Sequence, residues 1–244
     1  MTLEEAIAKI RPLDHNAMEI AQKRWDGIAK PLHSLGKLET LLIQIAGITG
    51  NAEVDLSRRG LIAMCADNGV VEEGVTQTGQ EVTAIVAENF LKYDTSVGVM
   101  CKQNHAEIFP VDMGMVTDTK VRTDHKIAYG TQNMTKGPAM TREQAVKGLE
   151  AGIDMVRELN DKGYRILATG EMGIGNTTTS SAVASVLLKQ PVEEMTGRGA
   201  GLTSEGLVRK INAIKKAIAL NKPDPEDAID VLAKVGGLDI AGMA

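Results

Sequence analysis

The stretch from Ile166 to Thr178 reads ILATGEMGIGNTT, an apolar run followed by glycines and then by threonines. The apolar run is typical of a buried strand over residues 164–169, and the Thr-, Ser- and Ala-rich segment at 176–188 predicts a helix. Glycines let the backbone approach a ligand closely and adopt positive φ. The start of a helix offers free N–H groups to an anion. The stretch therefore predicts a strand, an anion-binding turn and a helix.

A carboxylate, Glu171, lies inside this turn. Because it would repel a phosphate, it is expected to face a cationic or proton-bearing part of a ligand. The combination suggests a site that binds a phosphorylated substrate and also does chemistry. The alternative is a solvated loop carboxylate with no function.

Two earlier apolar runs, at residues 61–66 and 106–111, predict strands that also end in polar turns, beginning at Asp67 and Asp112. Strands that alternate with helices and are continuously apolar favour a parallel sheet covered on both faces. Ligands bind at the carboxyl ends of such strands. We therefore predict an α/β fold, with expected helices at residues 2–10, 14–29, 37–48, 81–91, 96–103, 141–159, 176–188, 204–220 and 224–234.

Composition argues against several classes of function. A net charge of -5 and 2% aromatic residues disfavour nucleic-acid binding, which needs a basic surface or stacking platforms. The two cysteines form no CxxC pair, and the four histidines are scattered without metal-ligand spacing. The acidic N-terminus has no apolar signal region, and no apolar run approaches the length of a membrane span. We expect a cytoplasmic protein without a membrane or nucleic-acid partner.

A second glycine-rich segment, TGRGAGLT at residues 196–203, precedes another expected helix, and Lys210 lies one to two turns inside that helix. A glycine turn followed by a lysine can cradle a phosphate. One such turn is a weak signal, but two turns before two helices strengthen it. An exposed helix lysine without function remains the alternative for Lys210.

Further motifs follow one another along nearly the whole chain, and all are read directly from the sequence: KP at 30–31, SLGKLE at 34–39, DNGV at 67–70, EGV at 73–75, GT at 130–131, PAM at 138–140, GEMGIGNTT at 170–178, GRGA at 197–200 and VLAKVGG at 231–237. Together they resemble the nicotinate-nucleotide–dimethylbenzimidazole phosphoribosyltransferases of cobalamin biosynthesis. Their number and order make coincidence a poor explanation.

The resemblance implies a Rossmann-like parallel sheet flanked by helices, with a smaller helical subdomain. Residues 1–50 would supply the N-terminal part of that subdomain, and residues 51–244 an α/β domain. It also implies a homodimer that transfers 5-phosphoribose from nicotinate mononucleotide to a base such as dimethylbenzimidazole and releases nicotinate. The pyridinium leaving group makes the anomeric carbon electrophilic, so no metal or cofactor is expected. A carboxylate would take the proton of the attacking base.

By the same resemblance, Glu171 matches the first active-site glutamate of the family. Asp67 is also expected among the substrate-binding residues; from its place after a strand it could simply cap the turn, and a direct catalytic role is disfavoured. The positions expected around the nucleotide are Gly173, Gly175, Asn176, Thr177, Gly197, Gly199 and Lys210.

Two departures concern the base. The family usually carries His where this chain has Asn68, and its base pocket uses a Ser and a Gln where this chain has Thr78 and Val86. Loss of the Gln amide removes a hydrogen-bond partner for a base nitrogen, and such partners dominate specificity. We expect the accepted base to differ from dimethylbenzimidazole or to be less restricted, with other benzimidazoles, a purine or a phenol as candidates.

A third departure is at Ala244, because family members continue beyond this point with a Gly-Glu-Gly loop whose glutamate is regarded as the general base. We expect a fragment or truncated chain. The alternative function is a non-catalytic nucleotide-binding fragment or subunit. A nucleotide kinase is disfavoured because the chain has no Walker lysine.

Overall fold

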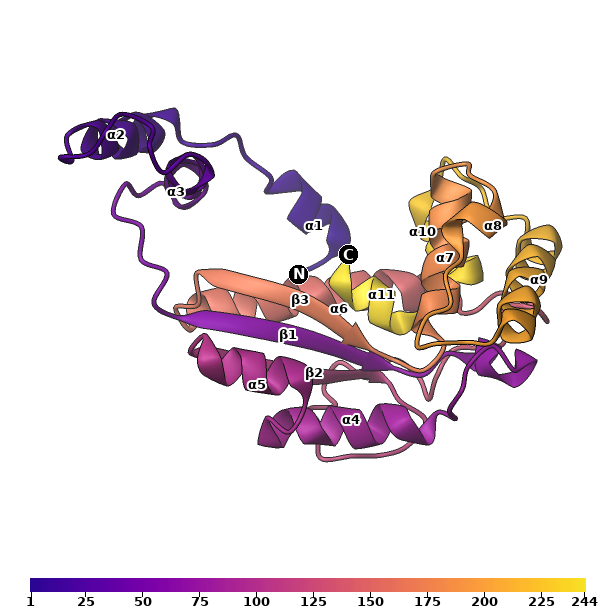
Figure 1. The fold of residues 1–244 in the computed structure, drawn as a ribbon. Helices are drawn as coiled ribbons and strands as arrows, with labels where there is room; N and C mark the ends of the chain where they lie inside the picture. The colour runs from indigo at the N-terminus through magenta and orange to yellow at the C-terminus, as the bar shows by residue number, and fades with distance from the viewer. The chain divides into compact units, whose positions relative to one another are not determined.

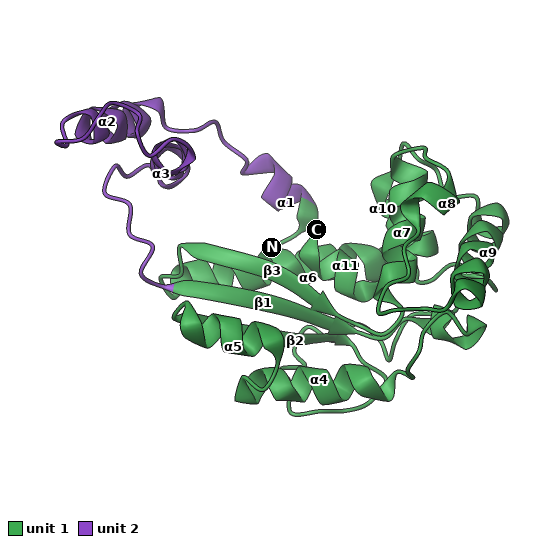
Figure 2. Cartoon of the chain, in the orientation of Figure 1, with its two compact units in different colours: residues 1–3, 59–244 green, residues 4–58 purple.

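The computed structural model describes residues 1–244. The chain forms two compact units (Figure 2): one comprises Glu4–Arg58, and the other comprises Met1–Leu3 together with Arg59–Ala244. No helix is both long and apolar enough to cross a bilayer. The assignment of residues 1–50 and 51–244 to separate domains stays a prediction.

The N-terminal unit is built mainly from two helices, α2 (His15–Asp26) and α3 (Lys37–Thr49), after the short α1 (Leu3–Ala8). Asp14 caps α2, because its Oδ1 atom accepts a hydrogen bond from Ala17 N at 3.0 Å. Within the unit, the Nζ atom of Lys30 lies 3.0 Å from Oε1 of the buried Glu39. This ion pair ties the KP and SLGKLE motifs together.

The larger unit is organised around a parallel sheet of β1 (Arg59–Ala66), β2 (Ala106–Gly114) and β3 (Ile166–Met172), in the order β2-β1-β3 (Figure 1). The predicted α/β class with a parallel sheet is confirmed. The central strand β1 is apolar beyond its first residue because both of its faces are buried.

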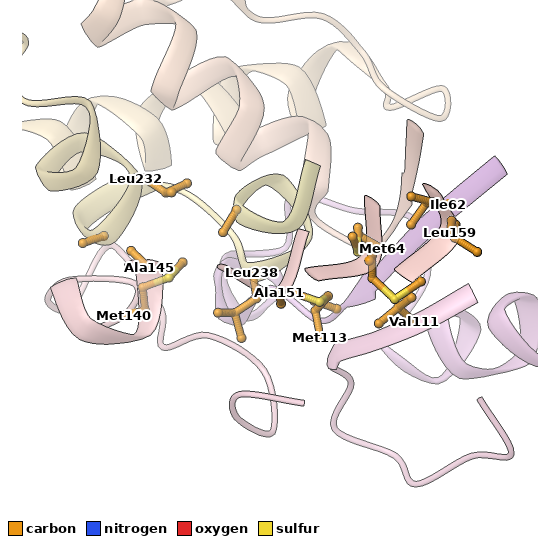
Figure 3. Packing of buried hydrophobic residues seen from close by; sticks show 14 of the residues in the cluster. Ile62, Met64, Val111, Met113, Met140, Ala145, Ala151, Leu159, Leu232 and Leu238 are labelled. Atoms are coloured by element: carbon orange, nitrogen blue, oxygen red, sulfur yellow. The ribbon is translucent and has the colours of Figure 1, made fainter. Parts of the chain in front are cut away.

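Helices cover both faces of the sheet. α4 (Glu81–Lys92) and α5 (Ser96–Gln103) pack on the face that carries Ala63 and Cys65. α6 (Arg142–Asp161) and α11 (Leu238–Met243) pack on the opposite face. Methionines fill the core between the sheet and these last two helices, where Met64 and Met113 cluster with Leu238 (Figure 3). The flexible Met side chain suits such irregular gaps, and this explains how a chain with few aromatic residues closes its core.

β3 is less buried than its apolar run predicts. It is an edge strand, and Ile166 is 43% exposed. The strand also begins and ends later than expected, at residues 166–172 instead of 164–169. Glu171 is therefore held near the end of the sheet's hydrogen-bonded ladder, opposite Met64.

The last third of the chain adds α7 (Asn176–Leu187), α8 (Val192–Met195), α9 (Ser204–Asn221) and α10 (Ala228–Val235), whose apolar faces share a second core with the 3-10 helix η1 (Gly69–Glu73). Ala182, Ile214 and Val231 lie in this core. The sequence did not predict α8 or α11, which are short and lack a full amphipathic period.

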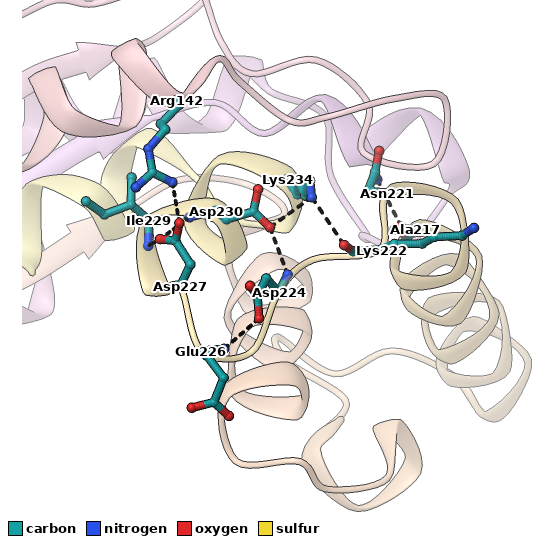
Figure 4. A network of polar contacts seen from close by, with 10 residues as sticks. All are labelled: Arg142, Ala217, Asn221, Lys222, Asp224, Glu226, Asp227, Ile229, Asp230 and Lys234. Atoms are coloured by element: carbon teal, nitrogen blue, oxygen red, sulfur yellow. Dashed lines mark hydrogen bonds and ion pairs between the residues drawn. The ribbon is translucent and has the colours of Figure 1, made fainter.

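Polar contacts fix α10 against its surroundings (Figure 4). Asp227 caps the helix, because its Oδ1 atom accepts hydrogen bonds from the backbone of Ile229 and Asp230, each at 3.1 Å. Arg142 Nη1 donates to Asp227 Oδ2 at 2.7 Å. The cap explains why the helix begins at Ala228 and not at the predicted Asp224.

Candidate active site

Each of the three strands delivers a carboxylate to its carboxyl end. Asp67 follows β1, Asp112 lies near the end of β2, and Glu171 near the end of β3. Cys65 pairs with Asp112, and Met64 pairs with Glu171, so these side chains lie at one edge of the sheet. Parallel α/β sheets bind ligands at this side, where the carboxyl ends of the strands lie.

Glu171 is partly buried and is held by the helix that follows it. Its Oε2 atom accepts a hydrogen bond from Asn176 Nδ2. Asn176 Oδ1 in turn accepts from Thr177 N at 2.7 Å. The two bonds orient the Asn176 amide, because only its nitrogen can donate to a carboxylate. The carboxylate is therefore fixed at the start of α7 and is not a freely solvated loop group.

The turn between β3 and α7 needs its glycines. A methyl group at Gly173 would lie 2.2 Å from the carbonyl oxygen of Ala66, so no side chain fits between this turn and the end of β1. Gly175 has φ +95°, a conformation that glycine adopts without strain. Gly175 confirms the positive φ that the sequence predicted. The close approach at Gly173 is to the end of β1, and the predicted approach of the backbone to a ligand stays a prediction.

Lys210 on α9 reaches the start of α7. Its Nζ atom donates to Thr177 Oγ1 at 2.7 Å and to the carbonyl oxygen of Gly197 at 3.2 Å. The residue is 1% exposed, which overturns the alternative of an exposed helix lysine. Burial lowers the pKa of its ammonium group, because a desolvated cation without a nearby carboxylate is unfavourable.

The two glycine turns enclose a small cleft of about 80 Å³. Gly199 and Gly201 have φ +55° and +102°, and the Gly201 carbonyl accepts a hydrogen bond from Gln77 Nε2. The cleft is lined by Val75, Thr76, Gln77, Ile174, Gly175, Asn176, Thr177, Arg198, Gly199, Ala200 and Leu202. Gly175, Asn176, Thr177 and Gly199 are thus brought together as lining residues, with Gly197 and Lys210 joined to them by hydrogen bonds.

Sequence reasoning missed Thr76, Gln77 and Arg198 in this lining. Arg198 is held by its own turn, because Nη1 donates to the Leu202 carbonyl at 2.8 Å. The segment 75–77 reaches the cleft from the loop after η1. The EGV motif at 73–75, read as part of the resemblance, was the only signal for that segment.

The structure does not bring Thr78 and Val86 to this cleft. Thr78 is exposed, and its carbonyl accepts a hydrogen bond from Thr76 Oγ1 at 2.8 Å. Val86 packs from α4 against the core that contains Cys65 and Phe90. Their assignment to a base pocket stays a prediction.

Asp67 is fully buried, and burial raises the pKa of its carboxyl group. Its Oδ2 atom accepts a hydrogen bond from Val116 N at 2.8 Å. The Asp67 carbonyl accepts from Thr131 N at 3.0 Å. These contacts fix the loops that follow β2, in line with the structural role expected for a capping aspartate.

Asp239, at the start of α11, is a further buried carboxyl group at this edge of the sheet. Its Oδ2 atom accepts a hydrogen bond from Asn68 Nδ2 at 3.2 Å. Sequence reasoning missed it because it lies in an apolar segment, although an acidic residue directly after Gly236-Gly237-Leu238 was a signal. No group of three or more His, Cys, Asp or Glu side chains is arranged to hold a metal ion.

Comparisons with known proteins agree on one family. The profile of a family described as phosphoribosyltransferase matches residues 10–244. The nicotinate-nucleotide–dimethylbenzimidazole phosphoribosyltransferase of Ruminiclostridium cellulolyticum is 53% identical over 245 residues, which cover 100% of this chain and 70% of that protein. The enzyme of the same name from Clostridium acetobutylicum is 52% identical, with the same coverage of 100% and 70%.

A crystal structure of CobT from Thermus thermophilus has a TM-score of 0.84 and 35% identity, and the match covers 93% of this chain and 69% of that one. A second crystal structure, of the nicotinate-nucleotide–dimethylbenzimidazole phosphoribosyltransferase from the same organism, has a TM-score of 0.81 and 34% identity, covering 95% and 69% of the two chains. The chain belongs to the nicotinate-nucleotide–dimethylbenzimidazole phosphoribosyltransferase family.

Proposed function

We propose that this protein transfers 5-phosphoribose from nicotinate mononucleotide to a benzimidazole-type base, as the names of its relatives indicate. The C–N bond between nicotinate and the ribose breaks, and nicotinate leaves with the bonding electron pair. A ring nitrogen of the base forms the new C–N bond at the same carbon and loses its proton. The products are nicotinate and an α-ribazole-type 5′-phosphate, the activated lower ligand for cobalamin biosynthesis.

The observation that carries this proposal is the buried Lys210. Its ammonium group is surrounded by neutral hydrogen-bond acceptors, and burial is the cause of its lowered pKa. A desolvated cation is stabilised by an anion that binds beside it. A phosphate at the cleft would supply that charge, while Thr177 and the backbone of the two glycine turns would supply hydrogen-bond donors.

The cleft, at about 80 Å³, suits a phosphate group better than a whole nucleotide. We therefore place the phosphate between Gly175–Thr177 and Gly197–Gly199, with the ribose extending towards the carboxyl end of β3. Binding energy gained at the phosphate then positions the reacting carbon. Glu171 lies at that end of the strand, joined through Asn176 to the turn that holds the phosphate.

Glu171 is proposed as the carboxylate that takes the proton of the attacking nitrogen. A positioned base contributes about 10²- to 10⁴-fold to such a step. Its hydrogen bond from Asn176 fixes its direction without neutralising it. Thr78 and Val86 are proposed to leave the base without an amide partner, so that more than one base is accepted.

We also propose that the protein acts as a homodimer in the cytoplasm. The N-terminal unit exposes Leu32, Leu35, Leu38 and Leu41, and exposed apolar groups of this kind favour self-association. Cys65 and Cys101 are both free thiols, as is usual for proteins of a reducing compartment. Light scattering at several protein concentrations tests the dimer.

The decisive experiment is incubation of the protein with nicotinate mononucleotide and dimethylbenzimidazole, with free nicotinate measured by chromatography. Release of nicotinate that depends on the base supports the proposal. Binding of nicotinate mononucleotide in calorimetry without any release would instead support a non-catalytic nucleotide-binding protein. Absence of binding would overturn the phosphate site.

A further inference from the structure

Asp239 and Asn68 form a buried pair that the proposed reaction does not use. Both side chains are fully buried. Asn68 Nδ2 donates to Asp239 Oδ2 at 3.2 Å, and Asp239 Oδ1 accepts from the backbone of Ile240 at 2.9 Å. Asn68 Oδ1 has no hydrogen-bond donor. Buried side-chain oxygens that accept no hydrogen bond are rare and call for an explanation.

The missing donor can be placed. A methyl group at Gly237 would lie 2.2 Å from Asp239 Oδ1 and 2.6 Å from Asn68 Oδ1, so both oxygens face the same small volume. A proton on Asp239 Oδ1 could reach Asn68 Oδ1. A neutral carboxylic acid and a carboxamide would then exchange two hydrogen bonds, one in each direction.

The surroundings favour the neutral acid. Burial raises the pKa of Asp239 to about 7, although the hydrogen bonds from the Ile240 backbone and from Asn68 act in the opposite direction. The charge of Glu171 adds a smaller rise. On β1 the buried thiol of Cys65 lies on the opposite face of the sheet from α11, and on β2 the Oδ2 atom of Asp112 lies 3.1 Å from Lys126 Nζ. α7 carries no ionisable side chain, and α6 meets α11 through its glycines.

The pair also lies directly against the turn that follows Glu171. A methyl group at Gly173 would lie 2.7 Å from Asp239 Oδ2 and 3.2 Å from Asn68 Nδ2. One at Gly175 would lie 3.1 Å from Asn68 Cβ. The backbone of residues 173–175 therefore packs directly against the side chains of Asn68 and Asp239.

We propose that Asp239 is a neutral carboxylic acid paired with Asn68, and that this pair is a positioning element for the turn at residues 173–175 and hence for Glu171. The link to Glu171 rests on the proposed function, whereas the protonation of the pair does not. When Asp239 loses its proton, Asn68 Oδ1 loses its donor and a second negative charge arises near Glu171. The turn is then expected to loosen.

The test begins with protonation in the native protein. Infrared spectroscopy should show a buried carboxylic acid at pH 6 whose band disappears as the pH rises through about 7. Asp239→Asn should remove the band, whereas Asp230→Asn, at an ion-paired aspartate on α10 with a lowered pKa, should keep it. If Asp239→Asn does not fold, the carboxyl carbons of labelled aspartates in the wild type provide the same titration by NMR. Absence of a carboxyl group that titrates near neutrality would overturn the proposal.

The second readout separates positioning from mere packing. Asparagine can reproduce both hydrogen bonds that the neutral acid exchanges with Asn68, and it loses only the bond accepted from Ile240 N. Asp239→Asn should therefore lose far less turnover at pH 6 than Asp239→Ala, for which about 100-fold is expected from a misplaced catalytic group. The wild type is expected to lose turnover above about pH 7, and Asp239→Asn should not show this loss. Equal pH profiles in the wild type and Asp239→Asn would overturn the positioning role. Persistence of the infrared band without any nicotinate release would overturn the proposed function alone.

Discussion

The Nζ atom of Lys210 lies 2.7 Å from the Oγ1 atom of Thr177. This hydrogen bond joins α9 to the first turn of α7, and a second bond from the same ammonium group, to the Gly197 carbonyl, reaches the other glycine turn. In the bond to Thr177, the donor is a buried ammonium group and the acceptor is a neutral hydroxyl. No carboxylate in this bond neutralises the lysine, so its positive charge is still available to a ligand. An anion that binds there meets a preorganised donor and a helix N-terminus together.

Replacement of Lys210 by methionine should weaken binding of nicotinate mononucleotide about 10- to 100-fold, because a charge-assisted hydrogen bond to phosphate contributes ~1.5–3 kcal/mol. Calorimetric titration measures the effect. Lys215 on the same helix is exposed and pairs with Glu193, so Lys215→Met is the matched control and should bind normally. Equal affinity in Lys210→Met and the wild type would remove the lysine from the phosphate site.

The lowered pKa of Lys210 predicts a proton linkage. Between its folded pKa and the unfolded value of 10.5, the unfolded chain binds more protons than the folded one, so the lysine's contribution makes the free energy of unfolding rise with pH in that window. Phosphate should raise the lysine's pKa and so draw in a proton at alkaline pH. Calorimetry in buffers of different ionisation enthalpy should show this uptake in the wild type and lose it in Lys210→Met.

Glu171→Gln should lower turnover about 10²- to 10⁴-fold with little change in binding of nicotinate mononucleotide, because it removes the proton acceptor and keeps the shape. The measurement is the rate of nicotinate release at saturating substrates. Glu193→Gln, at an exposed ion pair on α8, is the control and should react at the wild-type rate. Unchanged turnover in Glu171→Gln would show that another group takes the proton.

The sequence predicted the two glycine turns and Lys210, which the structure brings together, because the signals for them are local. Glycine turns before helices, and the apolar runs of β1 and β2, depend on neighbours in the chain. Asp239 could not be predicted in the same way, since its place in the site depends on a hydrogen bond from Asn68, which is far away in sequence. The exposure of β3 was missed for a related reason: the apolar residues of a strand do not reveal whether that strand lies in the centre of a sheet or at its edge.

Gly173→Ala should destabilise the protein by ~1–3 kcal/mol or prevent folding, because the new methyl group would overlap the Ala66 carbonyl, only 2.2 Å away. Gly197 belongs to the second turn, but a methyl group there meets nothing within 4 Å. Gly197→Ala should therefore unfold at the wild-type denaturant midpoint. Equal midpoints for the two variants would show that the turn after β3 can move away from β1.

Asp227→Ala should lower the free energy of unfolding by ~1–2 kcal/mol, because it removes the cap from two backbone N–H groups of α10. Arg142→Ala removes only a solvated ion pair whose side chains are 55% and 38% exposed, and should cost less than ~1 kcal/mol. Urea denaturation measures both. A larger loss for Arg142→Ala would show that the ion pair, and not the cap, fixes α10.

We expect base selectivity to follow from Thr78 and Val86, which the family resemblance matches to a Ser and a Gln of the base pocket. A buried amide partner can discriminate by about 10⁴- to 10⁵-fold, whereas an apolar contact reaches only about 10- to 200-fold. With Val86 at the position of the family's Gln, benzimidazole and dimethylbenzimidazole should react with kcat/KM values within about 200-fold of each other. Nicotinate release across a panel of benzimidazoles, purines and phenols measures this. Exclusive use of dimethylbenzimidazole would contradict it.

Val86→Gln separates the two roles open to that residue. In the structure Val86 packs against a core that includes Phe90, and an amide buried there without a partner should lower stability by ~1–3 kcal/mol. Thr78→Ala, at an exposed residue, controls for general effects of substitution in this region. If Val86→Gln instead stays stable and narrows the range of accepted bases, the side chain at residue 86 reaches the base, and selectivity in this family depends on a contact between α4 and the substrate.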